Sequence, residues 1–327
     1  MDTQLLTLMF PELGQQVRCQ LLGELNPALC EAVLRSLPIF SVQTHAVVAG
    51  KQIYFPTRLS LEDPNAARSE DMSRQPPGRI NFEPFFQYIS LNYGPVSEAV
   101  PAWPIAQVVE ADLPLLPKLG ELIWHNLLHG ADTLHVILSR AGLSASVPDA
   151  GRRQHVAPTE GMNPRSLTEL IVSETERIWL HEPQDSRELR TGRSNTEAGV
   201  AGQYFSPWVM VTGLIRGLSV VDVAALKRLS ANGKMTPQQL AELLSELLLV
   251  TAGVTSYFGL PELGGMLKAV RASCPRFTDA AELGAFLSAF STYLNRYNLW
   301  LHQGFPWRLG EQFTRNVEGD PSAGAGK

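Results

Sequence analysis

The stretch SASVPDAGRRQHVAPTEGMNP, residues 144–164, separates two parts of the chain that have different hydrophobic patterns. It is rich in proline, glycine and charged residues, and it shows neither the alternation of a strand nor the spacing of a helix. Segments of this composition connect domains. We therefore expect a first domain over residues 1–145, a linker over 146–164 and a second domain beyond it.

The part before the linker consists of short strand-like runs that are separated by turns. THAVV (44–48) and QIYF (52–55) flank Gly50 and predict a hairpin. Between earlier runs, residues 26–38 have helical spacing, with an Asn-Pro start and a proline stop. Residues 115–138 return to helical spacing. The first domain is therefore predicted to be mixed, α+β.

The part after the linker has helical spacing almost throughout. Three helix starts carry a candidate N-cap residue: Ser219, Thr236 and Thr278, each with an acid or an amide close behind it. Five or six helices over residues 165–318 predict an all-α bundle. We expect the tail, residues 319–327, to be disordered.

Charge and composition exclude several classes of protein. The chain has 327 residues, with 27 Lys and Arg against 32 Asp and Glu, so a net charge of -5 provides no cationic field for nucleic acid or for an anionic membrane. With 44% apolar and 18% charged residues, the composition is that of a folded globular protein. No run approaches an uninterrupted membrane span, so we expect no membrane association.

The cysteines and the N-terminus indicate the compartment. Cys19, Cys30 and Cys274 form neither a CxxC pair nor an even disulfide framework. The N-terminus opens with Asp2 in place of a positive region, and its apolar run is stopped early by Pro11. These features predict a cytoplasmic protein without a signal peptide.

Motifs for nucleotides and metals are absent from the sequence or incomplete in it. No GxGxxG follows a predicted strand, and neither a P-loop nor a GxSxG elbow occurs, so we expect no nucleotide cofactor. His125 and His129 have the spacing of two metal ligands on one helical face, but Asn126 stands where a zincin has glutamate. We therefore predict no metal.

Polar and apolar residues alternate in the segment YISLNYG, residues 88–94. Tyr88, Ser90 and Asn92 share one face of the predicted strand. Such a face lines a small-molecule pocket or, equally, faces solvent. His45 lies in another predicted strand, either as a proton carrier at such a site or as a buried histidine that is bonded to the backbone.

The first domain resembles the cyclophilin-like family over about residues 10–140. The resemblance rests on 17–22, 26–32 with Leu37 and Pro38, His45 with Gly50, and 88–90. A domain of this kind followed by a helical bundle looks like the cucumopine and mikimopine synthases. The resemblance implies a β-barrel with a helix over one end and a C-terminal bundle.

The resemblance also implies a reaction. L-Histidine condenses with 2-oxoglutarate to an imine, and the imidazole carbon closes the ring in a Pictet-Spengler reaction, without hydride transfer and without a cofactor. On this hypothesis Arg58 binds a carboxylate, His45 carries the proton, and Tyr88 and Ser90 orient the reacting groups together with Asn92, which binds substrate.

Further interpretations stay open. Trp208, at the entry to the second predicted bundle helix, is expected either to bind substrate at the domain interface or to pack in the core. The alternative function is a non-catalytic small-molecule-binding or scaffolding protein, in which the apolar helix over 240–250 serves the core or a contact within a homo-oligomer. Prolyl isomerase activity is disfavoured, because residues 81–86 match the required aromatic segment only in part.

Overall fold

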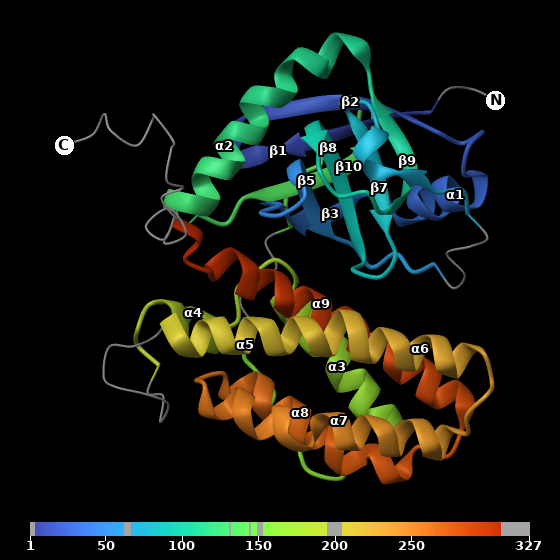
Figure 1. The fold of residues 1–327 in the computed structure, drawn as a ribbon, viewed down its shortest axis with the longest axis vertical. Coiled ribbons are helices and arrows are strands. Elements are labelled where there is room, and N and C mark those ends of the chain that lie inside the picture. Colours follow the sequence, from blue (N-terminus) through green and yellow to red (C-terminus); the bar gives the residue numbers. More distant parts are fainter. Residues whose placement is uncertain are drawn as a thin grey trace, which may run out of the picture.

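The computed structural model describes residues 4–61, 67–130, 132–143, 145–148, 153–194 and 205–308. The chain forms two parts, a sheet that nearly closes into a barrel and a group of helices below it (Figure 1). The predicted tail, residues 319–327, lies outside the described residues.

The first part is an antiparallel sheet of ten strands. Its strands are β1 (Leu5–Phe10), β2 (Gln15–Leu21), β3 (Ile39–Val42), β4 (Thr44–His45), β5 (Gly50–Pro56), β6 (Glu70–Asp71), β7 (Arg79–Glu83), β8 (Tyr88–Val96), β9 (Pro101–Val108) and β10 (His135–Arg140). The order is β3-β10-β1-β2-β9-β7-β8-β5-β4, with β6 paired to β9. The two end strands, β3 and β4, are consecutive in the chain and only Gln43 separates them. The sheet therefore curls until its ends meet, and this produces a barrel.

Two helices complete the barrel. They are α1 (Pro27–Ser36) and α2 (Leu116–His129), and both contribute to the apolar core that fills the barrel. In α2 the buried residues Leu119, Ile123 and Leu127 recur at helical spacing. Gly120 lets α2 approach β8, because a Cβ at this position would collide with the ring of Tyr93.

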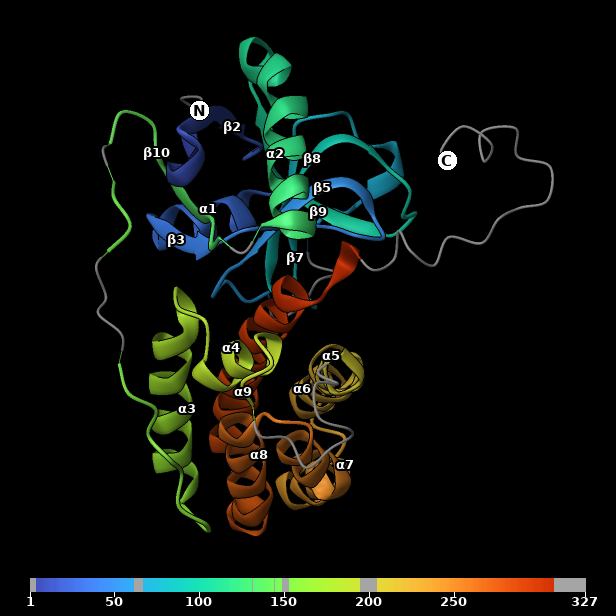
Figure 2. The same cartoon turned by 90° about the vertical axis from the view of Figure 1, so that its left-hand side faces the viewer.

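The second part is a bundle that is built around α9. Its helices are α3 (Pro164–Trp179), α4 (Gln184–Arg190), α5 (Phe205–Gly217), α6 (Ala224–Ala231), α7 (Pro237–Tyr257), α8 (Pro261–Ser273) and α9 (Ala280–Gly304). A π-helical stretch, Leu218–Val223, joins α5 to α6. Figure 2 shows that α9 runs through the bundle and that its C-terminal end reaches the barrel. The structure confirms the expected fold class, an α+β barrel followed by an all-α bundle.

Two helical stretches of the bundle, Phe205–Ala231 and Pro237–Tyr257, are long and apolar enough to span a membrane by length and composition alone. Both also provide residues to the bundle core, among them Trp208, Leu244 and Leu248. Core helices of soluble proteins can have the same length and composition without entering a membrane.

Three local predictions have different outcomes. The helix expected to reach residue 138 ends at His129, and β10 follows it, because pairing with β1 and β3 places the side chains of this segment in the barrel core. The cap at Thr236 is confirmed, with a capping box to Gln239. Ser219 does not start a helix but lies buried in the π-helical stretch, and Asp279 takes the cap position that was expected at Thr278.

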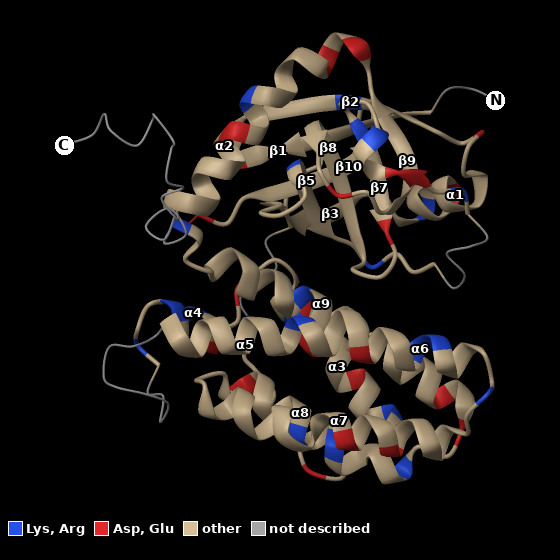
Figure 3. Cartoon of the chain, viewed as in Figure 1, with Lys and Arg blue, Asp and Glu red and all other residues tan. Residues whose placement is uncertain are grey.

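Charged residues are scattered over both parts and few lie in the strands (Figure 3). One exception is Arg18 on β2, which donates two hydrogen bonds to the carboxylate of Asp112 at 3.0 and 2.7 Å. Another is Glu83 at the end of β7, which lines a cavity between the barrel and the bundle.

Candidate active site

A cavity of about 700 Å³ lies between the barrel and the bundle. The barrel contributes β5, β7, β8 and β9 with the loops beside them, and the bundle contributes α5 and the end of α9. Its lining residues are Ala46, Val47, Val48, Ala49, Gln52, Tyr54, Met72, Glu83, Phe85, Phe86, Tyr88, Ser90, Glu98, Val100, Pro101, Trp103, Thr212, Arg216, Asn298, His302 and Trp307. An apolar cavity with a few convergent polar groups is the usual form of a small-molecule site.

Aromatic rings form one wall of the cavity. Tyr54 on β5 stacks on Tyr88 of the neighbouring strand β8, with 4.7 Å between the ring centroids. The ring of Phe86 also stacks on Tyr88, with 5.6 Å between the centroids. Burial raises the pKa of both tyrosines above the ordinary value, so they enter the cavity as neutral hydroxyl groups.

Glu83 is a largely buried acidic group in this cavity. It ends β7, directly opposite Tyr88 in the sheet, among the aromatic side chains. Burial, with a smaller contribution from the negative charge of Glu98, raises the pKa of its carboxyl to about 8. The hydroxyl of Ser90 donates a hydrogen bond to Glu83 Oε1 at 3.2 Å, which favours the carboxylate and opposes this shift. Glu83 can therefore both give and accept a proton near neutral pH.

Arg216 brings a positive charge to the cavity from the bundle. It lies on α5, and its guanidinium carbon is 5.4 Å from the centroid of the Phe86 ring. Within the part of the chain that the structure describes, Arg216 makes no ion pair with an acidic side chain. Its charge is thus available to an anionic group of a ligand. The π-helical stretch follows directly after α5, and such distortions are frequent at functional sites.

His302, at the end of α9, closes the cavity on the bundle side. Its ring lies edge-on to Tyr54, with centroids 5.8 Å apart, and 5.0 Å from the Trp307 ring. Burial lowers the pKa of His302 to about 4, so the imidazole is neutral at pH 7. Its Nε2–H donates to the backbone carbonyl of His45 at 3.2 Å.

The structure brings two of the six site residues predicted from the sequence into this cavity, Tyr88 and Ser90. Asn92, two residues further along the same face, is buried beyond it. Its carbonyl oxygen accepts from Gln52, and its amide nitrogen donates to Gln75, both at 2.9 Å.

His45 is buried beside the cavity, which its neighbour Ala46 lines. Its Nδ1–H donates to the carbonyl oxygen of Ala46, and its Nε2 accepts from the hydroxyl of Tyr93 at 2.7 Å. Burial lowers the pKa of His45. Both ring nitrogens therefore have partners inside the protein.

The two remaining predicted residues also lie away from the cavity lining. Arg58 pairs with Glu176 of α3, at 2.8 Å, and stacks on the ring of Trp179. Trp208 is fully buried in the bundle core, where its indole N–H donates to the carbonyl of Leu301 at 3.1 Å. These residues join the barrel to the bundle or stabilise the bundle itself.

Sequence reasoning missed Glu83, Arg216 and His302. A signal for Glu83 was present, because it is an acidic residue inside the aromatic segment NFEPFF, residues 81–86. No local pattern distinguishes Arg216 or His302 from other polar residues on amphipathic helices. Only the contact between bundle and barrel gives these two residues a role.

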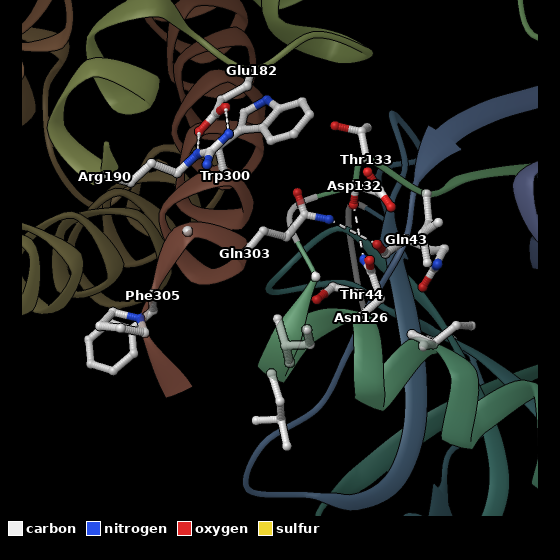
Figure 4. Close-up of a pocket in the computed structure, with 17 residues that line it drawn as sticks. Gln43, Thr44, Asn126, Asp132, Thr133, Glu182, Arg190, Trp300, Gln303 and Phe305 are labelled. Carbon is white, nitrogen blue, oxygen red and sulfur yellow. Dashed lines mark hydrogen bonds and ion pairs between the residues drawn. The ribbon is translucent and has the colours of Figure 1, made fainter. Parts of the chain in front are cut away.

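A second, smaller crevice of about 180 Å³ lies beside the end of α9 (Figure 4). Glu182 and Arg190 form an ion pair there at 2.7 Å, and the side-chain amide of Gln303 donates to the backbone carbonyl of Gln43 at 2.9 Å. Both polar side-chain atoms of Gln43 and Oε1 of Gln303 are buried without a hydrogen-bond partner among the described residues. The larger cavity is the candidate active site because it is about four times the volume and contains Glu83 and Arg216.

The described residues contain no group of three or more His, Cys, Asp or Glu side chains that could hold a metal ion. His125 and His129 lie side by side on α2, with ring centroids 4.9 Å apart, and both are exposed.

Comparisons with known proteins identify a relative of the helical part of the chain. Residues 165–304 match the family described as the cucumopine synthase C-terminal helical bundle domain. The helical part of the chain is thus similar to the C-terminal bundle of cucumopine synthases, and an antiparallel barrel precedes it.

Among solved structures, McbB in complex with tryptophan matches over 95% of this chain and 100% of that chain, with a TM-score of 0.81 and 26% identity. A hypothetical protein from Archaeoglobus fulgidus matches over 42% of this chain and 95% of its own length, at 19% identity and a TM-score of 0.31. A comparison with curated protein sequences finds no significant match.

Proposed function

We propose that this protein catalyses a Pictet-Spengler-type condensation. The amino group of an aromatic amino acid condenses with a carbonyl compound, and the aromatic ring then closes onto the new iminium carbon. The observation that carries the proposal is Glu83, a carboxyl group with a pKa of about 8 that faces an aromatic cavity. The match of the bundle to the cucumopine synthase C-terminal domain supports the same chemistry, and the likeness to McbB, which binds tryptophan, supports an aromatic amino acid as the amine.

Glu83 supplies the proton transfers that this reaction requires. The amine adds to the carbonyl and forms a carbinolamine. The protonated carboxyl of Glu83 gives its proton to the departing hydroxyl, which leaves as water, and an iminium ion remains. The ring carbon then bonds to the iminium carbon, and the Glu83 carboxylate removes the proton from that ring carbon. The aromatic ring is restored and Glu83 is protonated again, so the cycle closes with the release of one water molecule.

The other polar groups of the cavity orient the reactants. Arg216 binds the carboxylate of the amino acid substrate. The stacked rings of Tyr54, Tyr88 and Phe86 pack against its aromatic side chain. Ser90 holds the Glu83 carboxyl in position through its hydrogen bond.

Two amino acids are the leading candidates for the amine. The resemblance to cucumopine synthases favours L-histidine with 2-oxoglutarate, and the bound ligand of McbB favours L-tryptophan. Both have a nucleophilic ring carbon at a suitable distance from the amino group. The aromatic wall suits the larger indole, because stacking and burial of apolar surface grow with ring area.

The test is incubation of the protein with each amino acid and a panel of carbonyl compounds, followed by mass spectrometry for the sum of the two masses minus one water. An enzyme-free reaction corrects for spontaneous cyclisation. We expect product above this background with wild type, and product at background with Glu83→Gln. Binding of the amino acid to Glu83→Gln, measured by calorimetry, should persist, since the substitution leaves Arg216 and the aromatic wall in place. Equal turnover of wild type and Glu83→Gln would refute the role of Glu83.

A further inference from the structure

The charges that line the cavity limit which carbonyl compound can bind. Among the described lining residues, Glu83 and Glu98 are acidic, Arg216 is the one cation, and His302 is neutral at pH 7. On the proposed function, the carboxylate of the amino acid occupies Arg216. No second cation among the described lining residues is left for an anionic carbonyl substrate.

A 2-oxo acid would therefore bind at a cost. Each of its carboxylates would move from water into the cavity without gaining a cationic partner there. It would also lie in the same cavity as the side chain of Glu98, whose negative charge already acts on Glu83. L-Histidine together with 2-oxoglutarate brings three carboxylates to this single arginine.

One part of the cavity mouth is aliphatic. It is formed by Val47, Val48 and Ala49 from the loop between β4 and β5, and by Val100 with Pro101, the first residue of β9. The exposed side chains of Phe85 and Arg216 line the mouth as well. The loops that precede β5 and β9 are held together by a hydrogen bond from the backbone N–H of Ser97 to the carbonyl of Ala49, at 2.8 Å.

Two valines of this mouth present their side chains openly. Val48 is 76% exposed and Val100 is 41% exposed. A large apolar side chain that stays exposed at the rim of a cavity gains free energy when an apolar ligand covers it.

We propose that the carbonyl substrate is an uncharged aldehyde with an apolar substituent, which packs against Val48 and Val100. This inference rests on the proposed function. The absence of an acid group also selects an aldehyde over a ketone: a 2-oxo acid has a ketone activated by its neighbouring carboxyl group, whereas a simple ketone is a poor electrophile for an amine.

The experiment compares two aldehydes of similar size that differ in charge, 4-methylbenzaldehyde and 4-formylbenzoate, with glyoxylate and 2-oxoglutarate as further anionic probes. L-Tryptophan and L-histidine serve in turn as the amine, and kcat/KM is determined for each pair above the enzyme-free rate. We expect kcat/KM to be at least tenfold higher for 4-methylbenzaldehyde than for 4-formylbenzoate.

A charge placed at the mouth should reverse this preference. Val100→Lys introduces a cation where the aldehyde substituent packs, and we expect it to raise kcat/KM for 4-formylbenzoate and to lower it for 4-methylbenzaldehyde. Val100→Thr is the matched control, because it changes the polarity of the same position without adding charge, and it should keep the wild-type order. Circular dichroism verifies that both variants fold.

The outcomes separate this inference from the proposed function. Product only with the anionic carbonyl compounds would refute the inference that the carbonyl substrate is an uncharged aldehyde, and it would still support the condensing reaction. The inference is also refuted if wild type prefers 4-formylbenzoate, or if Val100→Lys leaves the preference for 4-methylbenzaldehyde unchanged. A lack of product with every carbonyl compound would overturn both the inference and the proposed function.

Discussion

The raised pKa of Glu83 predicts a loss of stability with increasing pH that a single substitution should remove. The carboxyl titrates at its ordinary value of 4.5 when the chain is unfolded and at about 8 in the folded protein. The unfolded state therefore loses this proton first as the pH rises. Between these two values the free energy of unfolding falls by about 1.4 kcal/mol for each pH unit, and above pH 8 it falls no further on account of this group.

At pH 7 the free energy of unfolding of wild type is therefore about 3 kcal/mol lower than it would be if residue 83 carried no titrating group. Glu83→Gln replaces the carboxyl with a neutral group of the same shape, so the variant should unfold with a free energy about 3 kcal/mol higher than wild type at pH 7. Near pH 4 the wild-type carboxyl is protonated in both states, and the two proteins should be about equally stable.

Urea denaturation at a series of pH values between 4 and 9 measures this difference. Glu246→Gln is the matched control, because it makes the same substitution at an exposed position on α7, outside the cavity. If the stability curves of Glu83→Gln and wild type run parallel from pH 4 to pH 9, Glu83 titrates normally and the reasoning about its proton transfers fails.

Four other predictions concern the cavity and its support. Glu98→Gln removes a like charge that adds to the effect of burial, so the pKa of Glu83 should fall and the alkaline limb of the pH profile of kcat should move to lower pH; an unmoved limb contradicts the coupling. Arg216→Met should raise KM for the amino acid by roughly tenfold to a hundredfold through loss of a charge-assisted contact, and Arg216→Lys should recover part of it, as steady-state kinetics would show. His45→Gln should form product with a kcat close to that of wild type and a lower Tm, because both ring nitrogens bond inside the protein; a large loss of kcat with normal substrate binding would restore His45 to the mechanism. Trp208→Phe should lower the free energy of unfolding by about 2–4 kcal/mol, measured in urea, because it removes a buried hydrogen bond and leaves a cavity, while KM stays unchanged; a changed KM would place Trp208 in substrate binding.

Local sequence patterns were sufficient to predict the two-part fold and one face of the site. Alternation along β8 places Tyr88 and Ser90 on the same side of the strand, because successive side chains of a strand point to opposite faces. The structure shows that this side faces the cavity. Likewise, the Thr-Pro-Gln-Gln start of α7 is recognisable from its cap, which depends only on neighbouring residues.

Tertiary contacts decided what local patterns left open. Residues 135–140 become a strand because the gap between β1 and β3 requires an apolar partner there, and this gap exists only once the barrel curls. The same reason explains the fate of Arg58, whose partner Glu176 lies on α3 of the bundle. A spacing rule cannot show such a pair, since the two residues are far apart in the sequence.

The candidate active site shows most clearly which features local sequence patterns determine and which features depend on tertiary contacts. The sequence by itself determined most of the elements and which residues share a face of an element, whereas residues 135–140 became a strand only through tertiary pairing. Only the tertiary structure decided that Glu83 of the barrel and Arg216 of the bundle line the same cavity. The physical reason is that periodicity reflects the geometry of a single element, whereas the pKa of a carboxyl and the free charge of a guanidinium depend on which groups from distant elements surround them.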